Sequence, residues 1–296
     1  MDKSQISKSF KETQEYICKR LENIDSVSSF KIDSWNRLEG GGGNTNTIKN
    51  GRIIEKGGVA FSEVFGNVSE SMSKQLKLDG NRFFATGVSI VLHSKSVYHP
   101  IIHMNIRYFE MDDDHYWFGG GIDLTPIYIN EELAVKFHQR LKVLCDCYHS
   151  SLYPKFKKEA DKYFYLPHRM ESRGIGGIFF DHFMESEFLS KEQIFLFCMD
   201  LGKLFPELYE EQITNAIESN EMTREWQLIR RSRYVEFNLL HDRGTKFGLY
   251  SGGRTESILM SMPPDTSWVY GHRVNENTLE HKTQQYLQGP VDWIKL

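Results

Sequence analysis

The stretch HMNIRYF, residues 103–109, carries three side chains with directed hydrogen-bonding groups at alternating positions. Because side chains on a β-strand alternate between its two faces, His103, Asn105 and Arg107 share one face. Histidine exchanges protons near neutral pH, and arginine binds a carboxylate or phosphate through two parallel hydrogen bonds. The pattern indicates a cationic surface for an anionic ligand. The alternative is a solvated face of an antiparallel sheet, but such faces usually carry Lys, Glu and Thr.

Other polar residues extend this surface. The segment 84–94 is a second expected strand, with Ser89 and His93 on one face. If the two strands are neighbours, these side chains converge with those of the first strand. Asp123 follows three glycines, which let another group approach the backbone closely, although a plain hairpin turn explains this Asp equally well. Asp181 lies within a very apolar strand, where a carboxylate must reach the surface or find a partner.

Two further arginines are candidates for binding an anion. Arg173 directly precedes a glycine turn. In SGGRTES, Gly252 and Gly253 offer main-chain amides to an anion, and Arg254 stands beside them. An ordinary hairpin turn with a surface arginine is the alternative for SGGRTES. Together these residues suit a ligand with several carboxylates or phosphates, but they do not identify a reaction.

Motifs for several other chemistries are missing from the sequence. It contains no Walker lysine-serine pair, no GxGxxG after a strand, no GxSxG, no HExxH and no CxxC. His93, His103, His138 and His168 could form a metal site, but they are widely separated along the chain. His138 lies on the apolar stripe of its expected helix, where a histidine is more often a core residue than a ligand. A metal site is therefore left open.

The totals are those of an ordinary globular protein, with 296 residues, a net charge of −4, 40% hydrophobic and 26% charged residues. The mildly acidic balance gives no electrostatic reason to expect nucleic acid or an anionic membrane as a partner. Four cysteines without a CxxC pair indicate reduced thiols. The N-terminus resembles neither a signal nor a transit peptide, and no apolar run predicts a transmembrane helix. We therefore expect a cytoplasmic location.

Apolar periodicity gives the elements that must position these residues. The expected helices cover about 6–24, 131–148, 153–164, 190–204 with a capping box of Ser190 and Gln193 and a stop at Pro206, and a segment ending near 231. The expected strands are 84–94, 101–109, 174–183, 232–240 and the end of 251–264. Glycines predict a loop at 40–43, a Gly-Gly bend within 52–66, and a hinge before a short strand in 117–128. Because several strands follow one another without a helix between them, we predict one α+β domain over 1–296, with an antiparallel or mixed sheet.

Several long motifs occur in order along the chain. They are EGGGG, IIEKGGVAFSEV, NRFFATGVSIVLH, HMNIRYFE, WFGGGIDLTP, YFYLPHRMESRGIGGIFFDHF, RYVEFNLLHDRGTKFGL and SGGRTESILMSMPP. From about residue 10 to its C-terminus, the sequence closely resembles the oxygen-dependent coproporphyrinogen III oxidases of haem synthesis. It departs from them at SKSVYHP after His93, where a more proline-rich turn is usual, and at His182, where an acidic residue is usual.

The resemblance implies a fold and a reaction. Family members carry a large, flat antiparallel β-sheet of about seven strands with helices packed on both sides, and they work as homodimers. They decarboxylate the propionates of two pyrrole rings of coproporphyrinogen III to vinyl groups, with O2 as electron acceptor. The products are protoporphyrinogen IX, carbon dioxide and hydrogen peroxide. The resemblance thus implies a tetrapyrrole substrate, O2 as co-substrate and no organic cofactor.

The resemblance also implies roles for individual residues. His103 matches the position of the family's proton-donor histidine. The substrate-binding positions of the family match Ser89, Asn105, Ile106, Arg107, Gly252, Gly253 and Arg254. Bacterial members are described with a divalent metal at positions matching His93, His103, His138 and His168, whereas other members work without an added metal. The region around 230–266 matches the part of the family that contributes to dimerisation.

A substrate with four carboxylates and four pyrrole N–H groups suggests two more roles. Arg173 joins Arg107 and Arg254 as a candidate to bind carboxylates. We hypothesise that Asp123 accepts the pyrrole N–H groups and is catalytic together with His103, while the pyrrole passes electrons to O2. Two other functions remain open: a porphyrinogen carrier or sensor without turnover, and a metal-dependent oxidase.

Overall fold

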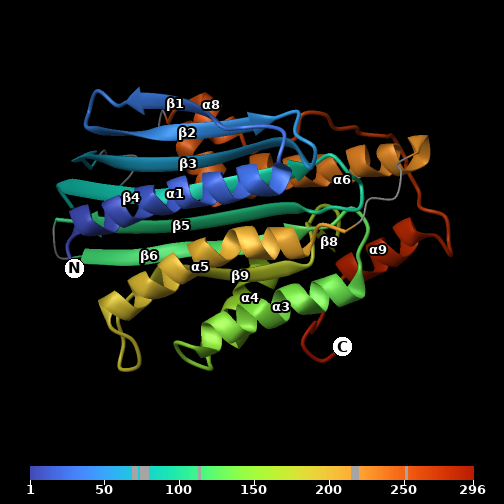
Figure 1. Cartoon of the computed structure of the whole chain (residues 1–296). Coiled ribbons are helices and arrows are strands. Elements are labelled where there is room, and N and C mark those ends of the chain that lie inside the picture. The colour runs from blue at the N-terminus through green and yellow to red at the C-terminus, as the bar shows by residue number, and fades with distance from the viewer. Residues whose placement is uncertain (69–72, 74–79, 113–114, 215–219, 251–252) are drawn as a thin grey trace.

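A seven-stranded sheet forms the centre of the molecule (Figure 1). The computed structural model describes residues 1–68, 73, 80–112, 115–214, 220–250 and 253–296. Each strand pairs antiparallel with its neighbour, and the order is β1-β2-β3-β4-β5-β6-β9. The strands are β1 Lys31–Asn36, β2 Gly41–Lys49, β3 Ile54–Asn67, β4 Arg82–Ser94, β5 Ile101–Met111, β6 His115–Thr125 and β9 Gly176–Phe183, while β7 Tyr165–Leu166 and β8 Glu171–Ser172 form a separate pair. The expected α+β class with an antiparallel sheet is confirmed.

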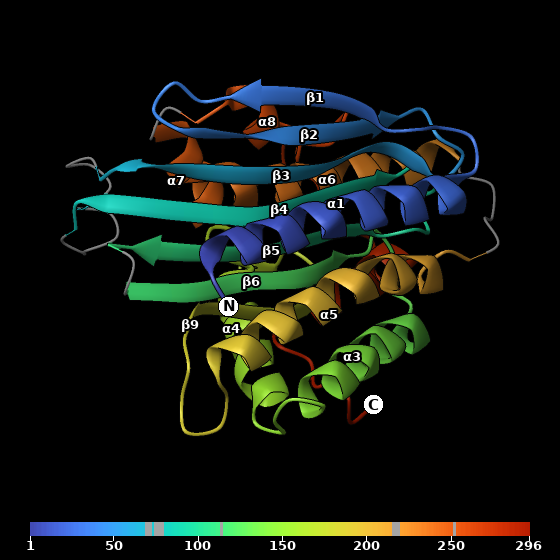
Figure 2. The same cartoon turned by 60° about the vertical axis from the view of Figure 1, so that its left-hand side comes forward.

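Helices cover both faces of the sheet (Figures 1 and 2). They are α1 Lys3–Asp25, α3 Glu131–Asp146, α4 Leu152–Tyr163, α5 Lys191–Glu211, α6 Glu221–Leu240, α7 Arg243–Tyr250, α8 Thr255–Leu259 and α9 Leu279–Leu287. The two views place α1 and α5 on one face of the sheet and α6, α7 and α8 on the other. Helix α4 packs on the edge strand β9. Among the described helices, none is long and apolar enough to cross a membrane.

Strand β5 shows why the two faces differ. Met104, Ile106 and Tyr108 are fully buried, which is what the period of two predicts for the core face. Ile106 points toward α5, because its side chain lies 3.4 Å from the place where a Cβ on Gly202 would stand. The alternate residues His103 and Arg107 are only partly buried and face the side of α6 to α8. We call this second surface the polar face.

Two helix boundaries differ from expectation. The segment 232–240 is the C-terminal half of α6, not a strand. This helix is buried on most of its surface, so its aromatic and β-branched residues reflect packing and not strand formation. Helix α5 begins with the expected capping box of Ser190 and Gln193 but continues past Pro206 to Glu211. Pro206 is buried in the core, where apolar packing offsets the hydrogen bond that proline removes.

The glycine-rich segments are strands where bends were expected. Strand β3 runs through Gly57 and Gly58 without a bend, β2 begins at Gly41 in place of a loop, and β6 continues through its three glycines. Many of these glycines stand where a neighbour fills the space of a side chain. For example, a Cβ on Gly58 would lie 2.2 Å from the sulfur of Met260. The end of 251–264 contains helix α8 in place of a strand.

Candidate active site

The polar face brings together residues of three neighbouring strands. In the register of β5 with β6, His103 lies opposite Asp123 and Asn105 lies opposite Gly121. In the register of β4 with β5, Ser89 lies opposite Asn105. Strands 84–94 and 101–109 are neighbours, which is the condition under which their polar side chains converge. The period of two therefore sets Ser89, His103, Asn105 and Asp123 side by side on one face.

The centre of this face is a hydrogen-bonded pair of His103 and Asp123. The Nδ1 atom of His103 lies 2.8 Å from Oδ1 of Asp123. Asp123 is only 1% exposed, whereas the side chain of His103 is 22% exposed. Because Nδ1 is bound to the carboxylate, proton exchange with a ligand falls to Nε2. A buried carboxylate that orients an imidazole in this way is a common device of acid–base catalysis.

Arg173 holds the carboxylate from behind. Its Nη2 lies 2.7 Å from each oxygen of Asp123, and its Nη1 donates to Oδ1 of Asn238 at 2.9 Å. Its guanidinium lies 4.5 to 4.6 Å from the centres of three aromatic rings, those of Phe164, Tyr234 and Phe237. Burial alone would raise the pKa of Asp123, but the charge of Arg173 and the hydrogen bond with His103 hold that pKa below its ordinary value. Asp123 is therefore an anion at neutral pH.

This geometry bears on two expected ligand contacts. Arg173 has a side-chain exposure of 1%, so in this structure its guanidinium reaches Asp123 and not a ligand on the surface. Both oxygens of Asp123 are likewise engaged by Arg173 and His103. The placement favours an orienting role for Arg173 and Asp123. Direct contact of either residue with a substrate stays a prediction.

Arg107 lies on the same face as an accessible cation. Its Nη1 donates to Oδ1 of Asn105 at 3.0 Å, and its Nη2 donates to Oδ1 of Asp181 at 2.8 Å. Gly119 lies opposite Arg107 in the register, and a Cβ at Gly119 would stand 2.7 Å from Nε of Arg107. The guanidinium thus rests on a bare stretch of β6. Asp181, whose environment the sequence left open, has found an ionic partner.

Arg254 also lies on the polar face, near the edge strand β1. It donates to Asp33 of β1 at 2.5 Å and to the hydroxyl of Ser257 at 3.3 Å. The expected anion-binding amide of Gly253 instead donates to the carbonyl of Gly248 at 2.8 Å. Gly252 lies outside the described residues. Arg254 is therefore placed as an accessible cation, whereas the amide of Gly253 is already used within the fold.

Ser89 and Ile106 complete the set of expected binding positions. Ser89 is partly exposed on the polar face beside Asn105. The side chain of Ile106 is fully buried on the opposite face, toward α5. Any contact of Ile106 with a ligand on the polar face must involve its main chain.

Comparison with known proteins decides the family. A family model described as coproporphyrinogen III oxidase matches residues 5–293. The chain belongs to the coproporphyrinogen III oxidase family. It is 45% identical to the mitochondrial oxygen-dependent coproporphyrinogen-III oxidase of Mus musculus and 44% identical to that of Homo sapiens. Each match covers 96% of this chain, but 67% of the mouse protein and 65% of the human protein, so the chain spans about two thirds of the length of these relatives.

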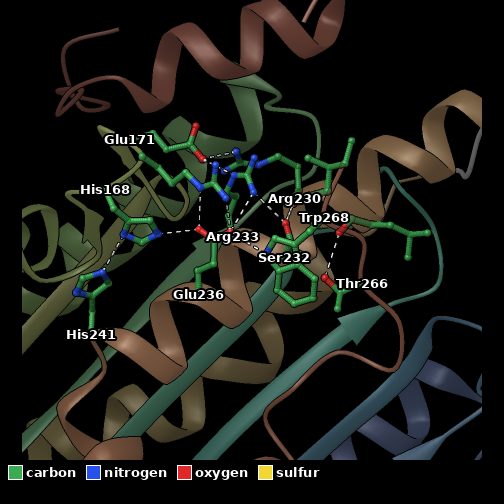
Figure 3. A network of polar contacts seen from close by, with 12 residues as sticks. His168, Glu171, Arg230, Ser232, Arg233, Glu236, His241, Thr266 and Trp268 are labelled. Carbon is green, nitrogen blue, oxygen red and sulfur yellow. Dashed lines mark hydrogen bonds and ion pairs between the residues drawn. The ribbon is translucent and has the colours of Figure 1, made fainter. Parts of the chain in front are cut away.

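The four histidines that match the metal positions of bacterial coproporphyrinogen III oxidases have separate surroundings in this chain. Their hydrogen-bond partners are Ser261 for His93, Asp123 for His103, Tyr153 and Ile175 for His138, and Glu236 and His241 for His168. Within the described residues, no three His, Cys, Asp or Glu side chains form a group that could hold a metal ion. His168 belongs to the ion-pair network on α6 shown in Figure 3. The arrangement does not fit a shared metal ion.

Several residues of the site were missed by the sequence prediction. Tyr234 and Asn238 enclose Arg173 from α6, and Arg243 lies 3.6 Å from Asp181. The prediction of a strand at 232–240 makes no use of the three-and-four spacing of Arg231, Tyr234 and Asn238. That spacing places the three side chains on one helical face and could have identified the sheet-facing side of α6.

Proposed function

We propose that the chain catalyses the oxidative decarboxylation of two propionate groups of coproporphyrinogen III to vinyl groups, giving protoporphyrinogen IX with O2 as electron acceptor. The observation that carries this proposal is the His103–Asp123 pair, which lies on one sheet face with Arg107 and Arg254. That face offers cations for the carboxylates of a tetrapyrrole and an oriented imidazole for proton exchange.

The balance of the reaction explains why a proton-exchanging group is needed. Each propionate anion loses carbon dioxide, one proton and two electrons and becomes a vinyl group. O2 takes the two electrons and becomes hydrogen peroxide, which requires one proton more than the propionate supplies. We assign the supply of that proton to Nε2 of His103. Asp123 stays ionised throughout and stabilises the protonated imidazole, and Arg173 keeps Asp123 ionised.

The remaining residues bind and orient the substrate in this account. Arg107 and Arg254 have side-chain exposures of 37% and 28%, so a carboxylate on the polar face can reach both. Because Gly119 and Gly121 carry no side chains, β6 adds no bulk of its own to the polar face here, and the guanidinium of Arg107 lies over Gly119. The electron-rich pyrrole supplies the electrons, so the proposed reaction needs no flavin, haem or nicotinamide.

Aerobic conversion of coproporphyrinogen III, followed by porphyrin fluorescence after chromatography, tests the proposal. We expect protoporphyrinogen to form in air and not under nitrogen, and the rate to persist in a strong chelator. Binding of coproporphyrinogen without turnover in air would indicate a carrier or sensor. Loss of turnover in the chelator, with recovery on adding one metal, would indicate a metal-dependent oxidase.

We further propose that the chain acts as a homodimer. Large apolar side chains are exposed along the segment 239–270, which overlaps the region that matches the family's dimerisation segment; they are Leu239, Leu240, Leu249, Tyr250, Trp268, Val269 and Tyr270. Exposed apolar groups gathered in this way mark an interaction surface. Light scattering during size-exclusion chromatography should give twice the mass of the chain. A monomer at micromolar concentration would contradict the dimer.

Two expectations stay predictions. The first is that residues 1–296 act as a single coproporphyrinogen oxidase domain. The second is a cytoplasmic location, since the names of the similar mouse and human proteins describe them as mitochondrial. Imaging of the tagged protein in its own cell decides the location.

A further inference from the structure

A β-bulge in β9 contains Asp181, the ionic partner of Arg107. Where β6 pairs with β9, Phe118 lies opposite Phe183 and Gly120 lies opposite Phe180. This leaves Gly119 opposite two residues, Asp181 and His182. Bulges are common next to functional sites, where they re-aim a side chain. Here the bulge lies directly beside the strand position of Arg107, because Arg107 and Gly119 are partners in the neighbouring register.

The residue after Asp181 holds the bulge in place. His182 has a φ of 48°, in the left-handed region that few residues other than glycine adopt readily. Its ring stacks on Trp117 with 4.7 Å between the ring centres, and its amide donates to Oδ1 of Asp181 at 3.1 Å. The strained backbone, the stacked ring and the amide together orient the carboxylate of Asp181. That carboxylate is thus placed by the fold and not by chance contact of two surface side chains.

Asp181 and Arg107 share one hydrogen bond, and a ligand carboxylate can take the place of Asp181. Only Oδ1 of Asp181 binds Arg107, while Oδ2 lies 3.6 Å from Nη1 of Arg243. The two side chains are 23% and 37% exposed, so both reach solvent. An arginine offers five N–H donors and binds a carboxylate best through two parallel bonds. A free carboxylate that binds Arg107 through two bonds can therefore replace Asp181 at little cost.

Asp181 must be ionised to compete with a ligand carboxylate for Arg107. Burial alone would raise the pKa of Asp181, but the charge of Arg107 and the hydrogen bond from it hold that pKa below its ordinary value. Asp181 is therefore an anion at neutral pH and competes with any other carboxylate for Arg107. Once displaced from Arg107, its carboxylate still has Arg243 beside it.

We propose that Asp181 occupies Arg107 as a built-in substitute for a ligand carboxylate, that a substrate propionate displaces it, and that it returns when that propionate has left as carbon dioxide. This inference rests on the proposed function. Each turnover removes carboxylates from the ligand, which would leave a cation on the polar face without a partner. The return of Asp181 to Arg107 weakens the hold on the product relative to the substrate. Asp181 is thus a residue that sets the difference in affinity between substrate and product.

The pair of Arg254 and Asp33 is a second case of the same arrangement. Arg107 and Arg254 are thus each bound by an aspartate of the chain itself. Asp33 lies on the edge strand β1 with 55% of its side chain exposed, so solvent screens this pair more strongly. We expect the same effect at Asp33, with a smaller size than at Asp181.

Binding of two stable porphyrins to the intact protein tests the inference. Coproporphyrin III carries four carboxylates and protoporphyrin IX carries two, and quenching of porphyrin fluorescence gives both dissociation constants. In Asp181→Asn we expect coproporphyrin to bind about three- to fivefold more tightly, the size of a partly exposed ion pair, and protoporphyrin to change by less than about twofold. Asp181→Glu restores the carboxylate and should return both constants toward the wild-type values.

Asp146→Asn is the matched control. It removes the same charge from an exposed pair with Lys142 on α3, away from the polar face, so it reports the effect of net charge alone. Unchanged or weaker coproporphyrin binding in Asp181→Asn, or equal tightening of both porphyrins, would overturn the inference and leave the proposed function standing. Failure of the wild-type protein to bind coproporphyrin at all would contradict the proposed function itself.

Discussion

His103 on β5 and Asp123 on β6 lie directly opposite each other, with Nδ1 and Oδ1 separated by 2.8 Å. The carboxylate of Asp123 is buried and charged, whereas the imidazole of His103 is partly exposed on the polar face. The strand register therefore builds an oriented imidazole without any loop, which keeps the position of Nε2 rigid. Substitutions around this pair separate catalysis, orientation and ligand binding.

Replacing His103 should remove proton exchange and little else. In His103→Gln we expect kcat to fall about a hundredfold or more, the usual contribution of general acid–base catalysis, while coproporphyrin binding stays within about twofold. Because His103 is partly exposed, the melting temperature should change little. The exposed His272→Gln is the control. A wild-type kcat in His103→Gln would remove His103 from the mechanism.

Replacing Asp123 or Arg173 alone should leave the other residue with a buried charge that has lost its ionic partner. Arg173→Met takes the buried cation from Asp123, and Asp123→Asn takes the buried anion from Arg173, so each variant should lose about 3–5 kcal/mol of unfolding free energy. The double variant removes both charges and should regain part of that loss, measured by denaturant unfolding. Its activity should stay low because His103 has lost its carboxylate. A double variant as unstable as the sum of the singles would show that the two charges do not depend on each other.

Adding one methyl group beneath Arg107 should weaken substrate binding. In Gly119→Ala the new Cβ would stand 2.7 Å from Nε of Arg107 and displace the guanidinium. We expect KM for coproporphyrinogen to rise about tenfold, the worth of a hydrogen bond to a charged group, with little change in kcat. Gly289→Ala is the control, because a Cβ there meets nothing within 4 Å. A fall in kcat at constant KM would assign Gly119 to the chemical step.

Acid should weaken the fold through Asp25 at the end of α1. This buried carboxylate accepts the main-chain amides of Ser28, Arg52, Ile53 and Ile54. Burial alone would raise the pKa of Asp25, but these amides lower it below the ordinary value of 3.8. The unfolded state therefore takes up the proton first as pH falls, so the stabilisation is present above about pH 3.8 and is lost below it.

Asp25→Asn tests this dependence. The variant should be less stable than the wild type at pH 7, by about 1–3 kcal/mol for hydrogen bonds to a charged group. The difference should shrink as the pH falls below about 4, where the wild-type carboxyl also becomes neutral. Denaturant unfolding at several pH values measures both curves. A difference that is the same at every pH would exclude the charge of Asp25 as its source.

Periodicity predicted the centre of the molecule well. The alternation in 101–109 identified both the strand and its polar face, because a half-buried strand leaves a clear period of two. It also found α1, α3 and the start of α5, where apolar stripes and capping residues agree. The edge strand β1 and its neighbour β2 were missed, because KIDSWN and GGGNTNTIK carry too few apolar residues to show an alternation.

The burial of Arg173 and the bulge in β9 could not be predicted from the sequence pattern. Arg173 was expected to meet the ligand, yet its closest charged partner is Asp123, and nothing in RGIGG predicts the aromatic cage around it. The bulge at Asp181 and His182 adds one residue to the register of β6 with β9, so that Phe180 and Phe183 both face the core. Such a shift follows from packing across several strands, which a single sequence does not reveal.

Release of carbon dioxide from coproporphyrinogen labelled in its propionate carboxyls tests the central claim most directly. The wild-type protein should release labelled carbon dioxide in air and none under nitrogen, and His103→Gln should release it about a hundredfold more slowly. No release by the wild type in air, or equal release under nitrogen, would contradict an O2-dependent decarboxylation on this face of the sheet.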